Sequence, residues 1–512
     1  MGSVVLGTSC KKYFDINANP NSAASVNVTP QLLLPGALNT TAGNLNSYNT
    51  MGAQIGGSMA NAGGYGGFGT AFTYQYGSGD QNGTWGTAYD NLEDYQTILD
   101  MTAKDPLMAN FNAAATIMKA LNFALLVDTY NDIPYSQALK GSELLSPVYD
   151  KAQDVYKDLA DQLDKAIATV NGAPADAKAL GASDILFKGD MGNWKKFANT
   201  IKLRLLVRGN GKVTFSNSTF SADGFLTTDA LINPGYVRDN GKQNPKFATW
   251  AFNYAGTTGN KSWMPSTWIM SFYNGVKLSD QGRGAAIYYK FPSTSTNQLG
   301  NEGLGIDPAP DGNFWYPAVN RNGASAGDTT GVLKGSNAGM PVITAAESYF
   351  LQAEAVLKGI LTTGDVKALF ENGVTASFKY IYSKPDGSFS GNPADDADKY
   401  MHIQNTGLYL ADFAAATTPD QKLEAIITQK YIALNMVNNN ESWNDYRRTA
   451  YPKLVNSPSA KATETFASKV SESSRADRLP SRVLYPTSEG SYNTANVPKG
   501  VSPFTSLIFW AK

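Results

Sequence analysis

The most regular pattern of apolar positions in the chain predicts a helix from about Trp194 to Arg208, ended by Gly209. Apolar side chains recur there at intervals of three and four residues, at Trp194, Phe197, Ala198, Ile201 and Leu205. Leu203, Leu206 and Val207 fall on a different face. A helix that is apolar on two sides is typical of one enclosed by neighbours. We therefore expect a scaffold helix with Trp194 buried between helices.

Other helical patterns come in pairs and predict a mostly α fold. Pro106 after Asp105, Thr344 before Glu347 and Thr418 before Gln421 are typical helix starts. The expected pairs cover residues 85–99 with 106–127, 147–170 with 194–208, 344–358 with 365–382, and 418–434 with 441–448. Four such helical hairpins predict a tetratricopeptide-like solenoid, with its scaffold at about 85–208, 342–382 and 418–450.

The rest of the chain has little helical periodicity. Residues 11–35 are rich in Asn and Pro and predict an extended lead-in, and the glycines and aromatic residues of 52–86 predict surface loops. A loop-rich insertion at about 209–340 and an irregular block at 451–512 remain. An insertion of that length must build its own layer on the scaffold. We expect residues 11–512 to form one unit whose irregular layer binds the ligand.

Composition narrows the function. The net charge is -1, and lysines and arginines form no basic stripe, which argues against nucleic-acid binding. No stretch is long and apolar enough to span a membrane, since Asn110, Asn112, Lys119 and Asn122 interrupt the best one. A charged fraction of only 17%, with many Gly, Asn, Ser, Thr and Tyr, suits the recognition of neutral polar ligands outside the cell.

The single cysteine suggests how the protein is held at the membrane. Cys10 follows a short apolar run with small residues, which resembles the end of a bacterial lipoprotein signal. Residues 1–10 would then be a residual signal and Cys10 the lipidated residue. The run lacks a basic segment and has Gly7 where such signals favour Leu. The alternative is a free thiol on the N-terminal segment.

Catalytic signals are few. A single histidine, His402, excludes a two-histidine zinc site, and its polar surroundings indicate an ordinary surface residue. The glycines from Gly63 to Gly69 lack the Lys and Ser/Thr of a phosphate loop. No cofactor is predicted, and no metal site; Asp128 and Asp132 could hold a structural calcium ion but lack the spacing of a known loop. A pair of glycosidase carboxylates stays open, because the chain has 43 acidic residues.

Binding signals are stronger. The apolar faces of sugar rings pack on aromatic side chains, and their hydroxyls need polar partners. Two regions supply both, an early loop and the insertion. We predict ligand contacts first from Trp315 and Tyr316, in a Pro- and Gly-containing loop where a large ring has little reason to be buried. The other predicted ligand contacts are Trp263, Tyr74, Tyr76, Asn82 and Asn313. Trp85, Trp268 and Trp443 lie on helical patterns and are expected in the core.

Several stretches taken together resemble the SusD/RagB family of nutrient-binding outer-membrane lipoproteins, in its second SusD-like branch. These stretches are Lys12 to Asn17, Leu32 to Pro35, Asp128 to Ser136, Asp184 to Arg208, Pro341 to Ala355, Gln429 to Leu434, Trp443 to Leu454 and Leu479 to Pro486. The resemblance implies a SusD-like fold and a lipid-anchored protein on the cell surface. It also implies capture of oligosaccharides, without cleavage, for a SusC-like TonB-dependent transporter as partner. In this family, Arg447 and Arg448 lie in a structural motif.

Three other functions are compatible with the sequence. Some relatives in the family capture peptides, so a peptide-capturing RagB-like lipoprotein is the main alternative. A glycoside hydrolase and a scaffold that binds only proteins through its solenoid are the others. Product formation from a bound oligosaccharide would identify the hydrolase, and co-purification of proteins without a soluble ligand would identify the scaffold.

Overall fold

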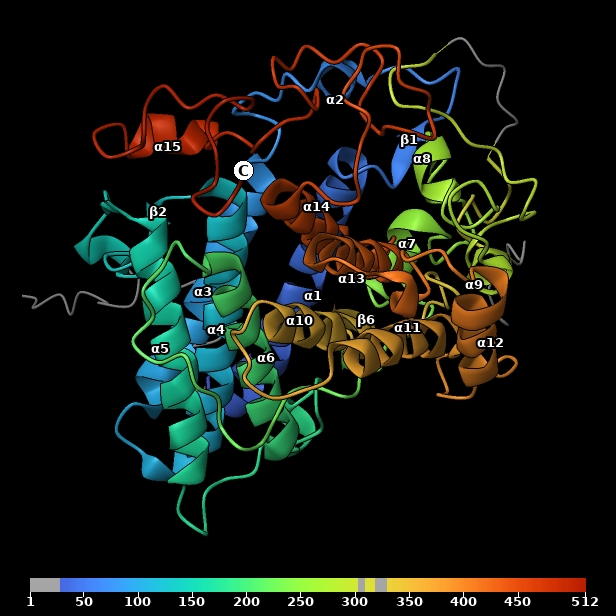
Figure 1. The fold of residues 1–512 in the computed structure, drawn as a ribbon. Coiled ribbons are helices and arrows are strands. Elements are labelled where there is room, and N and C mark those ends of the chain that lie inside the picture. Colours follow the sequence, from blue (N-terminus) through green and yellow to red (C-terminus); the bar gives the residue numbers. More distant parts are fainter. Residues whose placement is uncertain (1–27, 303–308, 318–328) are drawn as a thin grey trace, which may run out of the picture.

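The structure is a computed structural model that describes residues 28–302, 309–317 and 329–512. It confirms a mostly helical fold, in which strands are short and paired in twos (Figure 1). Cys10 lies outside the described residues. Among the described helices, none is long and apolar enough to cross a membrane.

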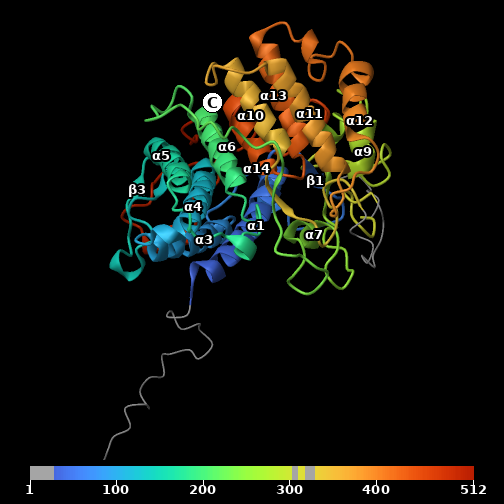
Figure 2. The same ribbon diagram turned by 90° about the horizontal axis from the view of Figure 1, so that it is seen from below.

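The first two predicted hairpins form a bundle of four adjacent helices (Figures 1 and 2). They are α3 (Asn82–Thr102), α4 (Ala109–Tyr130), α5 (Ala152–Asn171) and α6 (Met191–Gly209). Before α4, Asp105 caps a short 3-10 turn, as its sequence signal predicts. The helix expected from Pro147 begins later, because Tyr149–Asp150 forms the strand β3. Trp194 is fully buried, which confirms the prediction for α6.

The other two hairpins also form. They consist of α10 (Ala345–Leu357) with α11 (Val366–Tyr382), and of α13 (Pro419–Leu434) with α14 (Asn439–Thr449). Thr418 and Gln421 cap α13 reciprocally. Thr344 caps α10 without the reciprocal bond from the Glu347 side chain, because the Glu347 carboxylate binds Arg204 at 2.6 Å instead. Between the hairpins lie α12 (Pro393–Lys399) and the π-helix η7 (Tyr400–Gln404), which the apolar pattern did not indicate.

The expected extended lead-in is wrong from Pro30 onward, where helix α1 (Pro30–Ile55) begins. Its buried face combines apolar residues such as Leu38 and Leu45 with several Asn, Thr and Gly residues, and Pro35 lies inside the helix. Those polar groups bond to neighbouring helices; Thr41 donates to Asn91 Oδ1 at 2.7 Å. Gly52 packs directly on α14, where a Cβ would come within 2.3 Å of the Asn440 nitrogen. The helix exists because its neighbours satisfy its polar face.

Short elements make up the insertion and the irregular blocks. The strand pairs are β1 (Met59–Asn61) with β5 (Trp263–Pro265), β2 (Ile133–Pro134) with β3, and β4 (Ala230–Ile232) with β6 (Met340–Ile343). The short helices are α2 (Gly69–Thr73), α7 (Pro245–Trp250), α8 (Thr267–Met270), α9 (Gln281–Ile287) and α15 (Thr487–Tyr492). The insertion therefore forms its own layer on the helices, as expected, but residues 51–62 are buried where surface loops were predicted.

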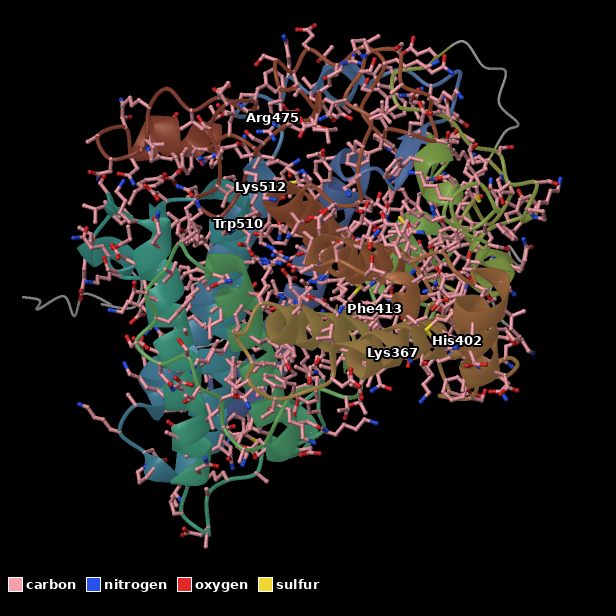
Figure 3. The ribbon with its side chains drawn as sticks, in the orientation of Figure 1. Lys367, His402, Phe413, Arg475, Trp510 and Lys512 are labelled. Atoms are coloured by element: carbon pink, nitrogen blue, oxygen red, sulfur yellow. The ribbon has the colours of Figure 1, made fainter. Side chains whose placement is uncertain are left out.

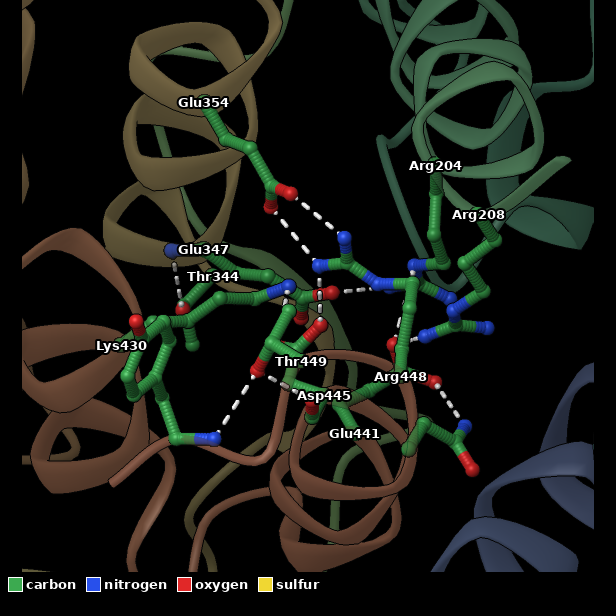
Figure 4. Close-up of polar contacts among 12 residues, drawn as sticks. Arg204, Arg208, Thr344, Glu347, Glu354, Lys430, Glu441, Asp445, Arg448 and Thr449 are labelled. Atoms are coloured by element: carbon green, nitrogen blue, oxygen red, sulfur yellow. Dashed lines mark hydrogen bonds and ion pairs between the residues drawn. The ribbon is translucent and has the colours of Figure 1, made fainter. Parts of the chain in front are cut away.

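A buried network of ion pairs holds α6, α10, α13 and α14 together (Figure 4). Arg448 binds Glu354 and Asp445, and Lys430 binds Asp445 at 2.9 Å. Glu441 accepts from Arg208 and forms an ion pair with Arg204. The expected structural role of Arg448 is thus confirmed, and Arg447 likewise stacks on Trp443, 3.6 Å from the ring centroid. Figure 3 shows Trp510 and Lys512 of the C-terminal segment beside this network, where the Lys512 amide donates to the Arg447 carbonyl.

Candidate ligand-binding site

The sheet β1–β5 brings together the two regions in which ligand contacts are predicted. Asn61, at the start of the early loop, lies opposite Trp263 of the insertion. The amide of Ala62 continues the pairing by donating to the Ser262 carbonyl at 2.7 Å. The pairing thereby brings together two segments that lie about 200 residues apart in the sequence. The early loop and Trp263 share one surface of the molecule.

The half-buried Trp263 ring packs with two buried rings, Phe68 and Phe72, in a cluster that we call the platform. The Phe68 ring meets Trp263 edge to face, with centroids 4.9 Å apart, and stacks on Phe72 at 5.1 Å. The Trp263 side chain is half-buried, and its indole N–H makes no hydrogen bond to any described residue. Tyr65, in the same loop as Phe68, is 37% exposed. An apolar ring face beside an available N–H donor fits the two needs of a sugar ring.

Asparagines fix the backbone around the platform. Asn297 donates to the carbonyls of Asn61 at 2.9 Å and Asn301 at 2.7 Å, and Asn301 donates back to Asn297 Oδ1. The amide of Gly300 donates to Asn61 Oδ1 at 3.2 Å. Asn301 is half-buried, and its Oδ1 accepts nothing from the described residues. Asn61 and Asn297 are therefore structural, whereas Asn301 offers a polar atom close to Trp263.

The sequence reasoning did not single out Phe68, Asn61, Asn297 or Asn301. A signal for Phe68 exists in the alternation of glycines and aromatic residues from Gly63 to Gly69. Gly64 and Gly67 have φ values of 80° and 88°, which residues with a Cβ rarely adopt. The glycines thus let the loop turn sharply so that Phe68 points inward onto Trp263.

Tyr74 and Tyr76 do not present their rings to solvent, contrary to the expectation for this loop. Tyr74 is fully buried and its hydroxyl accepts from the Ser468 amide at 3.1 Å. Tyr76 is 7% exposed. Burial raises the pKa of both phenols, so both are neutral donors. Tyr74 ties the early loop to the C-terminal block, and Tyr76 packs near Tyr74, with ring centroids 6.5 Å apart. A ligand contact from either stays a prediction.

Asn82 is exposed at the first position of α3. Its Oδ1 accepts from the Thr487 amide at 3.0 Å, which positions the start of α15. Its Nδ2 makes no bond to a described residue and could serve a ligand.

The expectation that Trp315 and Tyr316 are accessible is wrong. Both are fully buried, and Asn313 beside them is too. Trp315 packs edge to face on Trp250 at 5.5 Å, and Tyr316 packs on Phe252 at 5.6 Å. Asn313 adopts a left-handed backbone with φ 85° and accepts from the Trp315 amide. This segment is the hydrophobic core of the insertion, because the insertion is large enough to need one. A ligand-binding role for these three residues stays a prediction.

The residues considered for catalysis or metal binding have structural partners. His402 lies on the exposed η7 helix near Lys367 (Figure 3), with Nδ1 2.9 Å from Asp398, and hydrogen bonding to Asp398 raises its pKa. Asp128 binds Arg208, Tyr156 and Trp510, and Asp132 binds Lys151. In the described ranges, no three His, Cys, Asp or Glu residues are grouped so as to hold a metal ion.

Comparisons with known proteins agree with this architecture. A SusD-like protein from Bacteroides thetaiotaomicron VPI-5482 is 23% identical, with 93% of this chain and 98% of that chain covered and a TM-score of 0.64. A Bacteroidetes SusD-like protein, AC2a, is 20% identical, with 95% and 100% covered and a TM-score of 0.69. A chitin-binding protein is 21% identical, with 94% and 99% covered and a TM-score of 0.66. At these identities the likeness establishes the fold.

Comparisons of the sequence bear on the family of the chain as well as on its fold. No curated protein matches the sequence. A family model does match, over residues 20–486, which is most of the chain, and it includes both the helical scaffold and the Trp263 platform. The chain therefore belongs to the SusD-like family, whose members are described as starch-binding proteins that associate with the outer membrane.

Proposed function

We propose that the protein captures oligosaccharides at the cell surface, and that they dock on the Trp263 platform. The observation that carries the proposal is the half-buried Trp263 ring, braced by Phe68 and with its indole N–H unused by the described residues. A sugar ring would lie against the exposed part of the indole. Its hydroxyls would bond to Trp263 Nε1, to Asn301 and to the side chains of Ser262 and Lys261.

The platform favours a neutral glycan over a charged one. The other two rings of the platform, Phe68 and Phe72, bring no charge, and the nearby bracing residues are asparagines. Lys261 is the exposed cation next to the tryptophan. A surface without a cluster of like charges has no strong electrostatic preference, so contact area and hydrogen bonds would select the ligand.

Delivery and anchoring belong to the same proposal. The captured glycan would pass uncleaved to a SusC-like TonB-dependent transporter, with Cys10 carrying the lipid. The family supports this, because its members associate with the outer membrane. Replacement of Cys10 by Ser should move the protein from the membrane fraction to the soluble fraction. An unchanged distribution would contradict lipidation at Cys10. Retrieval of a TonB-dependent transporter with the intact protein tests the partner.

A glycan array followed by isothermal titration tests the capture. We expect at least one neutral oligosaccharide to bind, and Trp263→Ala to weaken it about fivefold or more, since a lost stacking contact is worth about 1 kcal/mol or more. Tyr492→Ala is the matched control, because this tyrosine is 81% exposed on α15, outside the platform. Equal affinities of the wild type and Trp263→Ala would remove Trp263 from the site.

The same assay separates the alternatives. Binding to a peptide library with no glycan binding would replace the sugar by a peptide as ligand. Chromatography of the incubated oligosaccharide would reveal shortened products if the protein were a hydrolase. Association with other proteins in the absence of any soluble ligand would support the protein-binding scaffold.

A further inference from the structure

A cavity of about 330 Å³ lies between the insertion and the third helical hairpin. The segment before β4 forms one wall with Thr227, Thr228 and Asp229, and α10 and α11 form the others. Trp263 and the early loop do not take part. Figure 1 shows β1 and α11 well apart in the molecule, so the cavity is separate from the platform. Its volume is within the range of small-molecule sites.

One face of α11 supplies hydrogen-bonding groups to the cavity. Asn372, Thr375 and Lys379 follow one another at intervals of three and four residues on a single stripe of this helix, and Ser383 lies just after its end. On the opposite wall are the hydroxyls of Thr227 and Thr228. Amide and hydroxyl groups from two walls can donate to and accept from the same ligand.

Asp229 holds an unused acceptor in this cavity. Its Oδ1 accepts from the Ala345 amide at 2.8 Å, whereas Oδ2 makes no hydrogen bond to a described residue. Burial raises the pKa of this carboxyl, which reflects its removal from bulk water. The Asp229 side chain is half-buried and lines the cavity, where this oxygen can accept from a ligand hydroxyl.

The charges in and behind the cavity balance. The exposed Lys379 and the Asp229 carboxylate both line the cavity, and Asp229 also interacts with the Lys334 ammonium. Lys334 lies behind the wall, where its Nζ is occupied by the carbonyls of Tyr380 and Ser383, and burial lowers its pKa to about 7. One negative and one positive group at the surface of the cavity favour a neutral ligand rather than an anion or a cation.

Two aromatic rings complete the lining. Tyr349 is half-buried on α10, and its hydroxyl makes no hydrogen bond within the described part of the chain. Phe389 is 48% exposed on a tight turn, in which Ser383 and Phe389 form an isolated antiparallel bridge. A large exposed ring at the rim of a polar cavity can cover an apolar ligand face.

We propose that this cavity is a second binding site, which takes a single neutral sugar residue or the end of a short neutral glycan. Asp229 Oδ2 accepts from ring hydroxyls, the side chains of Asn372, Thr375 and Tyr349 bond to other hydroxyls, and Phe389 covers the C–H face of the ring. The site acts independently of Trp263.

The test uses the full chain with 3-fluorotyrosine incorporated and ¹⁹F NMR as readout. The probes are the methyl α- and β-glycosides of glucose, mannose and galactose, titrated to about 50 mM so that a millimolar Kd is detected. Tyr349→Phe assigns the Tyr349 signal by removing it. We expect at least one probe to shift that signal saturably. Phe389→Ala and Asp229→Asn should each raise the Kd about tenfold or more.

Two controls make the result decisive. Asp386→Asn changes an exposed carboxylate on the same turn as Phe389 and should leave the Kd unchanged. Trp263→Ala should also leave it unchanged, so that this site and the platform can fail separately. No saturable shift with any probe, or a Kd insensitive to Phe389→Ala, overturns the proposal. Asn at position 229 keeps the acceptor for Ala345; if that variant unfolds, Phe389→Ala at the surface decides.

Discussion

Trp194 donates its indole N–H to Oδ2 of Asp184 at 2.8 Å, inside the protein. The same carboxylate accepts from the amides of Leu186 and Phe187 through Oδ1, and from the amide of Gly189 through Oδ2. One buried side chain thus closes the turn that precedes α6 and fixes the first large residue of that helix. This explains physically why the stretch from Asp184 to Arg208 carries the resemblance to the family without forming a site.

Replacing Asp184 by Ala should destabilise the protein by about 3 kcal/mol or more, because four donors lose their acceptor. Asp190→Ala should destabilise the protein less. Asp190 caps the same helix through the Asn193 amide, and loss of such a cap costs about 1 kcal/mol. Chemical denaturation of both variants should show the larger loss of unfolding free energy for Asp184→Ala. Equal losses would mean that Asp184 acts only as a local cap.

Trp315→Ala should act mainly on stability. The ring is fully buried against Trp250, so its removal leaves a cavity and should cost about 3–5 kcal/mol. Glycan affinity of the folded fraction should change little in comparison with Trp263→Ala. Thermal unfolding and isothermal titration on the same samples separate the two effects. A weakened affinity at unchanged stability would restore Trp315 as a ligand contact.

Phe68 and Trp263 should contribute to glycan binding as an energetically coupled pair. Phe68→Leu keeps an apolar side chain but removes the edge that orients the indole, and should weaken glycan binding by about 0.5–1.5 kcal/mol. In a double-mutant cycle, Phe68→Leu should add little to Trp263→Ala, since its effect passes through Trp263. Phe220→Leu breaks a similar ring pair with Phe225 elsewhere and should leave binding unchanged. Full additivity in the cycle would argue against the coupling.

Acid should weaken the ion network of Figure 4. Burial alone would raise the pKa of Glu354, but Arg448 and Lys358 outweigh it and hold the pKa below its usual value; Lys430 and Arg448 do the same for Asp445. The unfolded chain then binds more protons than the folded chain below about pH 4, where unfolded carboxyls titrate. The contribution of this network to the free energy of unfolding should therefore be steady above about pH 5 and fall as the pH drops below about 4.

Denaturant titrations of the wild type and Glu354→Gln between those pH values test the network. The variant should be less stable near neutral pH by about 3–5 kcal/mol, because Arg448 loses its charged partner. The gap should narrow toward acid, where the wild-type carboxyl also becomes neutral. The exposed Glu143→Gln should keep the wild-type profile. A gap independent of pH would show that charge at position 354 is unimportant.

Raising the pH above about 7 should increase the free energy of unfolding through Lys246. This side chain is buried, donates to the carbonyls of Met436 and Val437, and has its pKa lowered to about 7 by burial. Between pH 7 and 9 the unfolded chain keeps the lysine proton while the folded chain releases it, so this lysine makes stability rise with pH. The stability of the wild type relative to Lys246→Met should therefore grow over this range, by at most about 1.4 kcal/mol per pH unit. A constant difference would contradict titration of Lys246.

Local sequence patterns were sufficient to predict the helices that bury mainly apolar side chains. The four hairpins follow from stripes such as that of Trp194 on α6, and the cap of α13 follows from Thr418 and Gln421, because each needs only residues within one or two turns. α1 was missed, although Leu34, Leu38 and Leu45 recur on one of its faces, because Pro35 lies inside the helix and argues locally against it. The same buried face holds residues such as Asn44 and Asn49, whose partners lie far along the chain. Such long-range hydrogen bonds are not visible in a local pattern.

The candidate site divides in the same way. Composition, the scarcity of catalytic residues and the family motifs follow from the chain alone, and they already favour a binding protein with a helical scaffold. Which aromatic rings meet solvent depends on packing between distant segments. Trp315 is buried because the insertion needs its own core, whereas Trp263 stays half-buried at the first position of β5, although the strand β1 opposite it is buried. Both rings lie in loop-rich sequence with similar neighbours, so only the tertiary contacts distinguish a core residue from a binding surface.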